Sequence, residues 1–209
     1  MIVNEIFLSI QGESLSAGYP TIFVRFTGCN IRCQYCDTAY AYSEGKDMSP
    51  EEILQEIKKL SYNRVCLTGG EPLLQKDLGN LLKLLGDYIV TIETNGSIKL
   101  DTLQLCNNHS IVMDMKTPSS GCSDTMQFNN FEILSDRDEI KFVIGDRYDY
   151  EWSKVIMCKY FKKGNITFSP VFGKIEYKDI VEWILNDRLN VRFQLQLHKF
   201  IWNPDKRGV

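Results

Sequence analysis

Long hydrophobic runs and patches of basic charge are both missing from this chain of 209 residues. No apolar run approaches the roughly 20 residues that a membrane-spanning helix needs. The N-terminal stretch "MIVNEIFLSI" lacks the basic region that precedes the apolar part of a secretory leader. Lysine and arginine are scattered among acidic residues, and the formal net charge is -3. We therefore expect a cytoplasmic protein that binds neither membranes nor nucleic acid.

Histidine is scarce, and the cysteines are unevenly spread along the chain. There are two histidines and seven cysteines, an odd number that fits poorly with a secreted disulfide framework. Cys29, Cys33 and Cys36 crowd into "CNIRCQYC", and no fourth cysteine lies close by. Such a group in a reducing compartment indicates a metal or redox site. Cys66, inside an apolar stretch, is instead predicted to be a small core residue.

The length and the hydrophobic content of 44% suit one domain over residues 1–209, and no repeat or linker marks a second. Apolar, β-branched stretches predict strands, with the last of them less regular than the rest. These strands are expected at 21–28, 64–70, 88–96, 110–117, 139–146, 165–172 and 191–200.

Helical patterns separate these strands. "SPEEILQEIKKL" begins with a capping box, Ser49 and Glu52, and has Pro50 at the first helical position. "KDLGNLLKLLGD" and "DYEWSKVIMCKYFKKG" are expected to end at Gly86 and Gly164. Apolar strands alternating with helices indicate an α/β domain with a parallel sheet covered on both faces. Six or seven strands are too few for an eightfold barrel of about 250 residues, so an incomplete barrel or an open doubly wound sheet remains.

Polar loops follow five of the predicted strands. They are "TGC", "TGGEP", "ETNG", "DMKTPSSG" and "SPV". Any one of them could be an ordinary turn, because Gly, Thr, Asn, Asp and Pro are common turn residues. Together they share the carboxyl edge of the sheet with the cysteine triad, and this edge is where parallel sheets assemble their sites.

Three kinds of site compete for the cysteine triad. A structural zinc takes four protein ligands, and His109 and His198 are not spaced as a pair to complete it. A simple electron carrier with a four-iron cluster also takes four cysteines. A cluster held by three thiolates instead leaves one iron open to a small molecule, unless Cys122 supplies a fourth thiolate. The missing fourth cysteine favours the open iron.

"CNIRCQYC" followed by a strand-borne "TGGEP" resembles the radical S-adenosylmethionine superfamily. More narrowly, "IQGES", "PTIFVRFTGCN", "CDTAY", "TGGEPLLQ", "ETNG", "KFVIGD" and "QLHKFIW" resemble the 7-carboxy-7-deazaguanine synthase family, from about residue 5 to residue 202. The resemblance implies an incomplete (β/α)6-type TIM barrel with helices outside, a [4Fe-4S] cluster on the triad, and S-adenosylmethionine on the open iron. It also implies a homodimer and an electron donor such as flavodoxin or ferredoxin.

The implied reaction is the ring contraction of 6-carboxy-5,6,7,8-tetrahydropterin to 7-carboxy-7-deazaguanine with loss of ammonia. The resemblance implies that a 5'-deoxyadenosyl radical made from S-adenosylmethionine starts the reaction by removing the hydrogen at C6. The cofactor thus performs the difficult chemical step, as is general for cofactor-dependent enzymes. The product is a precursor of 7-deazapurines such as queuosine.

By analogy with the family, a set of residues at the strand ends lines the S-adenosylmethionine site. The set is Tyr35, Asp37, Gly70, Asp114, Lys116 and Ser169. In "TGGEP", the glycines allow close backbone approach, and Glu71 offers a carboxylate to the ammonium of the cofactor. Asp114 and Lys116 have a simpler alternative, a strand-end ion pair of little energetic consequence.

The pterin needs a cation for its carboxylate and partners for its pyrimidine edge. Arg25 suits the carboxylate because guanidinium is a planar fork, although an ion pair with Glu5 or Glu13 would also explain it. The resemblance implies further substrate contacts. They are the backbone of Ile10, Gln11 and Gly12, the Thr68 hydroxyl, Glu93 and Asn95.

Thr38 and the C-terminus complete the expected site. The resemblance implies that the hydroxyl of Thr38, in "CDT", binds Mg²⁺, with Asp37 as the rival ligand and a simple turn cap as the alternative. It also implies that Val209 reaches the substrate with His198 and Lys199 nearby, although terminal residues commonly fray.

Two other functions stay open. Activating enzymes of the same superfamily, which install glycyl radicals on a partner protein, use a triad of this spacing but lack the combination of "QGE", "CDT" and "ETNG". A non-catalytic iron–sulfur or zinc module would bind metal without cleaving the cofactor.

Overall fold

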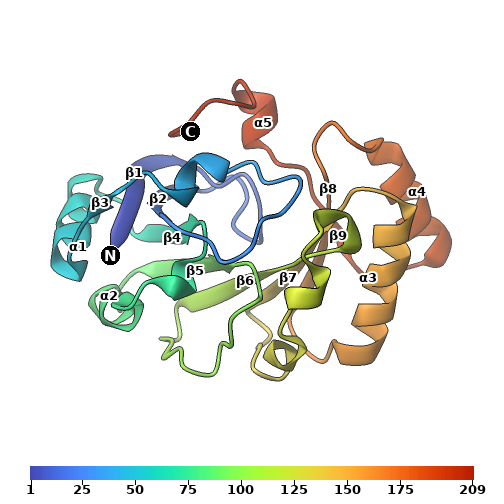
Figure 1. Ribbon diagram of the computed structural model, residues 1–209, viewed down its shortest axis with the longest axis horizontal. Coiled ribbons are helices and arrows are strands. Elements are labelled where there is room, and N and C mark those ends of the chain that lie inside the picture. Colours follow the sequence, from blue (N-terminus) through green and yellow to red (C-terminus); the bar gives the residue numbers. More distant parts are fainter.

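A computed structural model describes residues 1–209, which form one nine-stranded sheet with helices packed against it (Figure 1). The strand order is β3-β1-β2-β4-β5-β6-β7-β8-β9. The strands are β1 (Ile2–Ile10), β2 (Pro20–Phe26), β3 (Lys46–Asp47), β4 (Arg64–Gly69), β5 (Ile89–Thr94), β6 (His109–Met115), β7 (Glu139–Ile144), β8 (Asn165–Pro170) and β9 (Arg192–Phe193).

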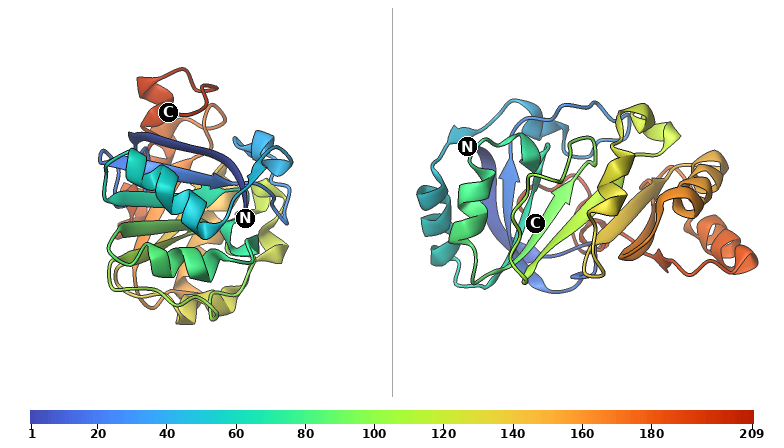
Figure 2. Two further views of the ribbon diagram at one scale, coloured as in Figure 1. Left: turned by 90° about the vertical axis from the view of Figure 1, so that its left-hand side faces the viewer. Right: turned by 90° about the horizontal axis from the view of Figure 1, so that it is seen from below.

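From β2 to β9 every neighbouring pair of strands is parallel, while β1 runs antiparallel to β2. The sheet does not close, because its edge strands β3 and β9 are not paired; the dark-blue β1, which neighbours β3, and the orange strands near the C-terminus lie toward opposite ends of it (Figure 2). This arrangement confirms the predicted incomplete α/β barrel and rules out the open doubly wound alternative in favour of a sheet that curves around a central cavity.

The two faces of each central strand differ in chemistry, because successive side chains of a strand point to opposite faces. In β2, Ile22, Val24 and Phe26 are fully buried under the outer helices, whereas Phe23 and Arg25 lie on the inner face. The same alternation holds in β4 to β8, where inner positions are largely polar. Apolar outer residues therefore build the core, and the interior of the barrel is left for a site.

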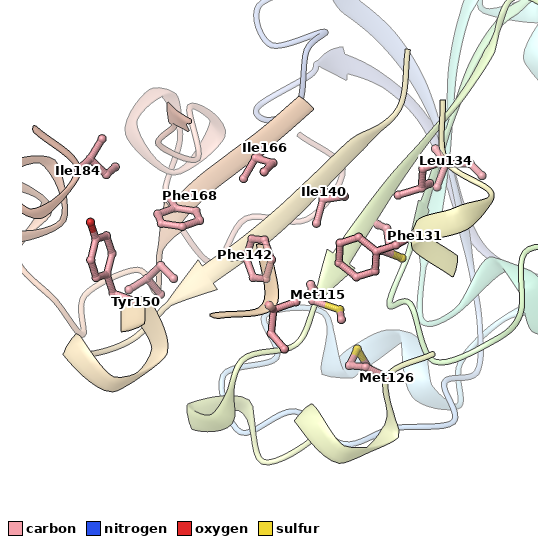
Figure 3. Packing of buried hydrophobic residues seen from close by; sticks show 14 of the residues in the cluster. Met115, Met126, Phe131, Leu134, Ile140, Phe142, Tyr150, Ile166, Phe168 and Ile184 are labelled. Carbon is pink, nitrogen blue, oxygen red and sulfur yellow. The ribbon is translucent and has the colours of Figure 1, made fainter. Parts of the chain in front are cut away.

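The five α-helices are α1 (Pro50–Lys59), α2 (Leu78–Leu84), α3 (Arg147–Tyr160), α4 (Tyr177–Asp187) and α5 (His198–Ile201). α1 and α2 cover one end of the sheet, and α3 and α4 cover the other (Figure 1). Figure 3 shows the second of these cores, where Phe142 and Phe168 pack edge to face and Tyr150 of α3 lies against Phe168. No helix combines the length and apolar character needed to span a membrane.

The observed bounds of several strands and helices differ from those predicted from the sequence. β1 was not expected as a strand, and the stretch expected as a strand over 191–200 pairs with β8 only at Arg192–Phe193 before it enters α5. The capping box of α1 is confirmed, with Ser49 Oγ accepting the Glu52 amide. α2 ends at Leu84 with Leu85 as its C-cap, so the expected Gly86 follows it directly, whereas α3 ends at Tyr160 with Phe161 as its C-cap, three residues before Gly164.

Side-chain and backbone hydrogen bonds bridge the gap between the two ends of the barrel. The Gln194 amide accepts the Ser14 N–H at 2.6 Å and donates to the Ser14 carbonyl at 2.9 Å. The Leu197 amide donates to the Gly12 carbonyl at 3.0 Å. The segment after β1 is thereby tied to the segment after β9, and both border the central cavity.

Candidate active site

The barrel encloses a cavity of about 950 Å³, large enough for a cofactor and a substrate together. It lies on the inner face and at the carboxyl edge of the parallel strands. Of the residues that the sequence assigned to a site, the cavity is lined by Ile10, Gln11, Gly12, Arg25, Cys29, Cys33, Tyr35, Cys36, Asp37, Thr38, Thr68, Gly70, Glu93, Asn95, Asp114, Lys116, His198, Lys199 and Val209. Glu71 and Ser169 are the two that do not line it.

The three cysteines of the triad occupy the loop after β2, and their thiols are free and partly exposed to the cavity. No group of three or more His, Cys, Asp or Glu side chains gathers closely enough to hold a single metal ion. The triad therefore does not have the geometry of a structural zinc site, whereas a four-iron cluster takes each cysteine on a different iron atom. Asn95 contacts this loop, with its Nδ2 3.6 Å from Cys29 Sγ.

Cys122 lies beside Cys33, because the Gln34 amide donates to the Ser120 carbonyl at 2.9 Å and so fixes the two loops together. Burial, with Cys122 and Asp114 adding to it, raises the pKa of the Cys33 thiol to about 12. Cys122 is buried and does not line the cavity. Cys66 is fully buried within β4, as expected for a core cysteine.

The "TGGEP" loop packs directly on the cysteine loop. The Gly70 amide donates to the Phe26 carbonyl at 3.0 Å, and the Glu71 amide donates to the Gly28 carbonyl at 2.8 Å. A Cβ on Gly70 would collide with the Gly28 carbonyl, and Gly69 has φ 119°, so both positions require glycine. This close approach leaves the backbone of Gly70 exposed in the cavity next to the triad.

The Glu71 carboxylate has a different place from the one that the sequence suggested. It is fully buried, and its oxygens accept hydrogen bonds from the Thr94 hydroxyl at 2.9 Å and from the amides of Leu73 and Asn95 at 3.0 and 2.7 Å. Burial raises the pKa of this carboxyl, and the three donors oppose the rise. Glu71 joins the ends of β4 and β5 and does not face the cavity.

Arg25 and Glu5 are paired directly across β2 and β1. Arg25 Nε donates to Glu5 Oε1 at 2.7 Å, so one of the ion pairs considered from the sequence is present. The pair uses only Nε, and the two terminal nitrogens of the guanidinium make no hydrogen bond within the protein. Burial opposes the charge, but Tyr40 and Glu5 hold the pKa of Arg25 above its ordinary value. Arg25 is thus a fixed cation in the cavity wall with its fork still available.

Glu93 occupies the inner face of β5. Its two carboxylate oxygens accept hydrogen bonds from the Thr68 hydroxyl at 2.7 Å and from the Gln11 side-chain amide at 3.1 Å. Thr68, Glu93 and the Gln11 side chain therefore form one polar group, although only the backbone of Gln11 was expected to contact the substrate. Across the cavity, Phe7 and Phe23 stack with ring centroids 5.1 Å apart and give it an apolar wall.

A second charged group links β6 and β7. Asp114 Oδ2 lies 2.9 Å from Lys116 Nζ and 3.6 Å from Lys141 Nζ, and Lys141 also pairs with Glu13 at 3.0 Å. Burial opposes ionisation of Asp114, but the two lysines hold its pKa below the usual range. Asp114 Oδ1 is buried without any hydrogen-bond partner, so it can accept a bond from a molecule in the cavity.

Lys141 and Glu13 were not assigned to the site from the sequence, yet both line the cavity. Burial works against the Lys141 ammonium, but Glu13, Asp114 and Glu93 together hold its pKa well above the ordinary value. The signal that could have found Lys141 is the one that marked Arg25, a cation in an apolar strand.

Thr38 and Asp37 follow the last cysteine of the triad. The Thr38 hydroxyl donates to Asp37 Oδ1 at 2.8 Å and makes no capping bond to the short helix η1 (Ala39–Tyr42), so the simple turn-cap alternative is wrong. Asp37 Oδ2 accepts from Lys199 at 3.0 Å. Although its surroundings oppose ionisation, Lys199 and Thr38 hold the pKa of Asp37 below the usual range. With its proton directed at Asp37, the lone pairs of Thr38 Oγ1 remain free for a cation.

His198 and His109 play different parts. His198 of α5 lies against Gly12 at the cavity, and burial lowers its pKa, which keeps the imidazole neutral at pH 7. His109 is fully buried at the start of β6, where its Nε2 lies 3.2 Å from the Leu85 carbonyl. Ser169 is also buried, on the inner face of β8, without reaching the cavity.

Comparisons with known proteins agree with this geometry. The family model described as "Radical SAM superfamily" matches residues 23–185. The chain is 44% identical to a 7-carboxy-7-deazaguanine synthase of Clostridium acetobutylicum, over 99% of this chain and 98% of that protein. It is 39% identical to a protein of the same name from Koribacter versatilis, over the full length of both. The crystal structure of QueE from Escherichia coli superposes with a TM-score of 0.78 at 25% identity, over 94% of each chain.

The family model covers most of the parallel sheet, and the relatives match the chain almost end to end. Membership of the superfamily implies that the triad takes a [4Fe-4S] cluster with S-adenosylmethionine on its open iron, and the free thiols and the exposed Gly70 backbone fit these two groups. The chain belongs to the radical S-adenosylmethionine superfamily and, within it, to the 7-carboxy-7-deazaguanine synthase family.

Proposed function

We propose that this enzyme converts 6-carboxy-5,6,7,8-tetrahydropterin to 7-carboxy-7-deazaguanine. The names of the relatives support the product. The observation that favours it most in this chain is that the cysteine triad and Arg25, a buried cation with a free fork, open into one cavity. Ammonia is the only other product, so the ring contraction is redox-neutral overall and needs no oxidant.

The residues of the carboxyl edge are suited to hold the two cofactors. When bound, the reduced cluster and S-adenosylmethionine supply a 5'-deoxyadenosyl radical that removes the hydrogen at C6 of the pterin. The Gly70 backbone would meet the methionyl group, and the unpartnered Oδ1 of Asp114 would accept a hydroxyl or ammonium proton of S-adenosylmethionine. Tyr35, Asp37 and Lys116 line the same part of the cavity and complete this proposed site.

The pterin would lie deeper, on the inner face of the strands. The terminal nitrogens of Arg25 would bind its carboxylate as a fork, while the Glu93 carboxylate would accept the N–H groups of the pyrimidine edge. Thr68, Asn95 and the backbone of residues 10–12 would supply the remaining polar contacts. The stacked pair Phe7 and Phe23 would give the ring an apolar wall.

We propose that Mg²⁺ binds with the substrate at Thr38. Mg²⁺ keeps several waters and commonly takes one or two protein oxygens plus oxygens of an anionic substrate. The free lone pairs of Thr38 Oγ1, beside the ionised Asp37, fit that pattern. The ion would orient the pterin and stabilise negative charge on its oxygens. At the open end of the cavity, Val209 and His198 would close over the substrate.

The remaining expectations about this chain stand as proposals. Residues 1–209 are proposed to act as a single domain, which the continuous nine-stranded sheet supports. An electron donor such as flavodoxin or ferredoxin would reduce the cluster, and family resemblance supports a homodimer.

Anaerobic reconstitution tests the proposed reaction. The protein would be loaded with iron and sulfide, reduced, and incubated with S-adenosylmethionine and the pterin, and the products would be identified by mass spectrometry. We expect a product lighter than the substrate by one ammonia. Because this conversion is redox-neutral, the hydrogen removed from C6 must be returned in each turnover, so 5'-deoxyadenosine is expected in less than stoichiometric amount, from cofactor cleavage that is not followed by this return. Formation of 5'-deoxyadenosine only after a protein partner is added would favour an activating enzyme instead. No 5'-deoxyadenosine under any of these conditions would favour a non-catalytic metal module.

A further inference from the structure

The C-terminal segment returns to the cavity and lies against η1, as the red end of the chain above β1 and β2 shows (Figure 1). The guanidinium carbon of Arg207 is 3.9 Å from the centroid of the Tyr40 ring. Arg207 Nη1 is also 3.5 Å from Glu44 Oε2. Glu44 is itself anchored, because its carbonyl accepts the side-chain amide of Asn4 at 2.8 Å. Arg207 is therefore held by two groups of one rigid loop.

Local turn chemistry brings Arg207 to this place. Asn203 Oδ1 accepts the Asp205 amide at 3.0 Å, and the Asn203 carbonyl accepts the Lys206 amide at 2.9 Å. Gly208 has φ 71°, a left-handed conformation that favours glycine. The chain thus reverses after α5 in a defined turn and does not simply trail away from the protein.

Tyr40 connects this segment to the cation in the cavity. Its hydroxyl donates to Glu5 Oε1 at 3.1 Å, and the same oxygen accepts Arg25 Nε at 2.7 Å. The Tyr40 ring centroid lies 5.8 Å from the Arg25 guanidinium carbon, so the ring is within cation–π distance of both Arg25 and Arg207. A displacement of Tyr40 would free Glu5 to turn, and Arg25 would lose the contact that fixes its fork.

We propose that Arg207 and Tyr40 are positioning residues that hold Arg25 for recognition of a ligand carboxylate. The inference rests on the proposed function, since it takes the carboxylate to be that of the pterin. Docking of the C-terminal segment fixes the Tyr40 ring, the Tyr40 hydroxyl fixes Glu5, and Glu5 fixes Arg25. Selectivity for a carboxylated pterin then depends on a residue that does not itself need to touch the substrate.

Calorimetric binding of two stable ligands, pterin-6-carboxylate and pterin, tests the proposal without turnover. We expect Arg207→Ala, which loses a cation–π contact and an ion pair, and Tyr40→Phe, which loses the hydrogen bond to Glu5, each to weaken binding of pterin-6-carboxylate about threefold to tenfold. Binding of pterin, which has no carboxylate, should not change. Arg147→Ala is the matched control, because Arg147 also stacks on an aromatic ring and pairs with a glutamate, but on the far helix α3.

The decisive comparison is made in an Arg25→Ala background. There, Arg207→Ala should cause no further loss of affinity for pterin-6-carboxylate, because the cation that it positions is gone. An equal loss in both backgrounds, or equal weakening of both ligands, would overturn the inference. If the unaltered protein does not prefer pterin-6-carboxylate over pterin, the proposed function has failed instead. Thermal melting of each variant separates these outcomes from simple unfolding.

Discussion

The carboxylate of Glu71 and the backbone amide of Asn95 are joined by a 2.7 Å hydrogen bond across the ends of β4 and β5. The side chain of Asn95 also contacts the cysteine loop. Its Nδ2 donates to Asn30 Oδ1 at 3.1 Å and lies 3.6 Å from Cys29 Sγ. The glutamate of "TGGEP" therefore supports the loop that carries the triad. A buried carboxylate that accepts three hydrogen bonds is suited to holding these segments together.

Glu71→Gln should destabilise the protein more than it affects cofactor affinity. A glutamine has only one acceptor oxygen, so a buried donor loses its partner, and the free energy of unfolding should fall by about 1–3 kcal/mol. Chemical denaturation measures the loss, with exposed Glu56→Gln as the control. Affinity of the folded, cluster-loaded variant for S-adenosylmethionine should stay near that of the unaltered protein. A stable variant with greatly weakened affinity would instead place Glu71 at the cofactor.

Substitutions of the cysteines should separate the triad from its neighbours. Alanine at Cys29, Cys33 or Cys36 removes one of three cluster ligands, so the absorbance of the four-iron cluster and the activity should both disappear. Cys66→Ala and Cys122→Ser should keep both, since neither side chain lines the cavity. Iron content and visible absorption after reconstitution provide the measurement. A Cys122→Ser variant without a cluster would make Cys122 a fourth ligand.

Thr38→Ala should uncouple the cofactor from the substrate. The cluster and the cleavage of S-adenosylmethionine should persist, while product formation and its dependence on Mg²⁺ fall, because the proposed metal ligand is lost. The amounts of product and of 5'-deoxyadenosine would be measured in the same samples over a series of Mg²⁺ concentrations. Thr38→Ser restores the hydroxyl and should recover the response. An unchanged Mg²⁺ response in Thr38→Ala would show that the metal lies elsewhere.

Lys141→Met should give a loss of stability that depends on pH. It leaves the carboxylates of Asp114 and Glu13 in a largely buried site without their shared cation, which costs about 3–5 kcal/mol near neutral pH. Lys116 and Lys141 hold the pKa of Asp114 low, and a lowered carboxyl pKa adds stability above the unfolded value that is lost as pH falls. Without Lys141, Asp114 should take up a proton more readily.

The stability deficit of Lys141→Met should therefore be largest at pH 7 and above and shrink below about pH 5, as Asp114 becomes protonated. Urea denaturation at a series of pH values measures it. Lys59→Met, which removes an exposed lysine paired with Glu56, should change stability by less than about 1 kcal/mol at every pH. A deficit that is as large at about pH 3.5 as at pH 8 would contradict the ion-pair account.

Sequence patterns predicted the fold class and nearly half of the residues that line the cavity, and two of the residues that were missed or misplaced show the limits of such patterns. Arg25 was found because a cation interrupts an apolar strand, and Lys141 in "EIKFVI" has the same property on the inner face of β7. The position of Glu71 could not be read from "TGGEP", since it depends on donors at the end of another strand. The alternating stretch 191–200 resembles a strand, but most of it has no strand to pair with and instead forms hydrogen bonds to the segment after β1.

The central claim is that the cavity directs a radical to C6 of the carboxylated pterin. The most direct test uses substrate with deuterium at C6 in a reconstituted, reduced enzyme, and measures by mass spectrometry where that deuterium goes. The account predicts deuterium at the 5' carbon of S-adenosylmethionine re-formed after turnover and in any 5'-deoxyadenosine that is released, together with 7-carboxy-7-deazaguanine. Product formed with deuterium in neither species, or cofactor cleavage with no product, would contradict it.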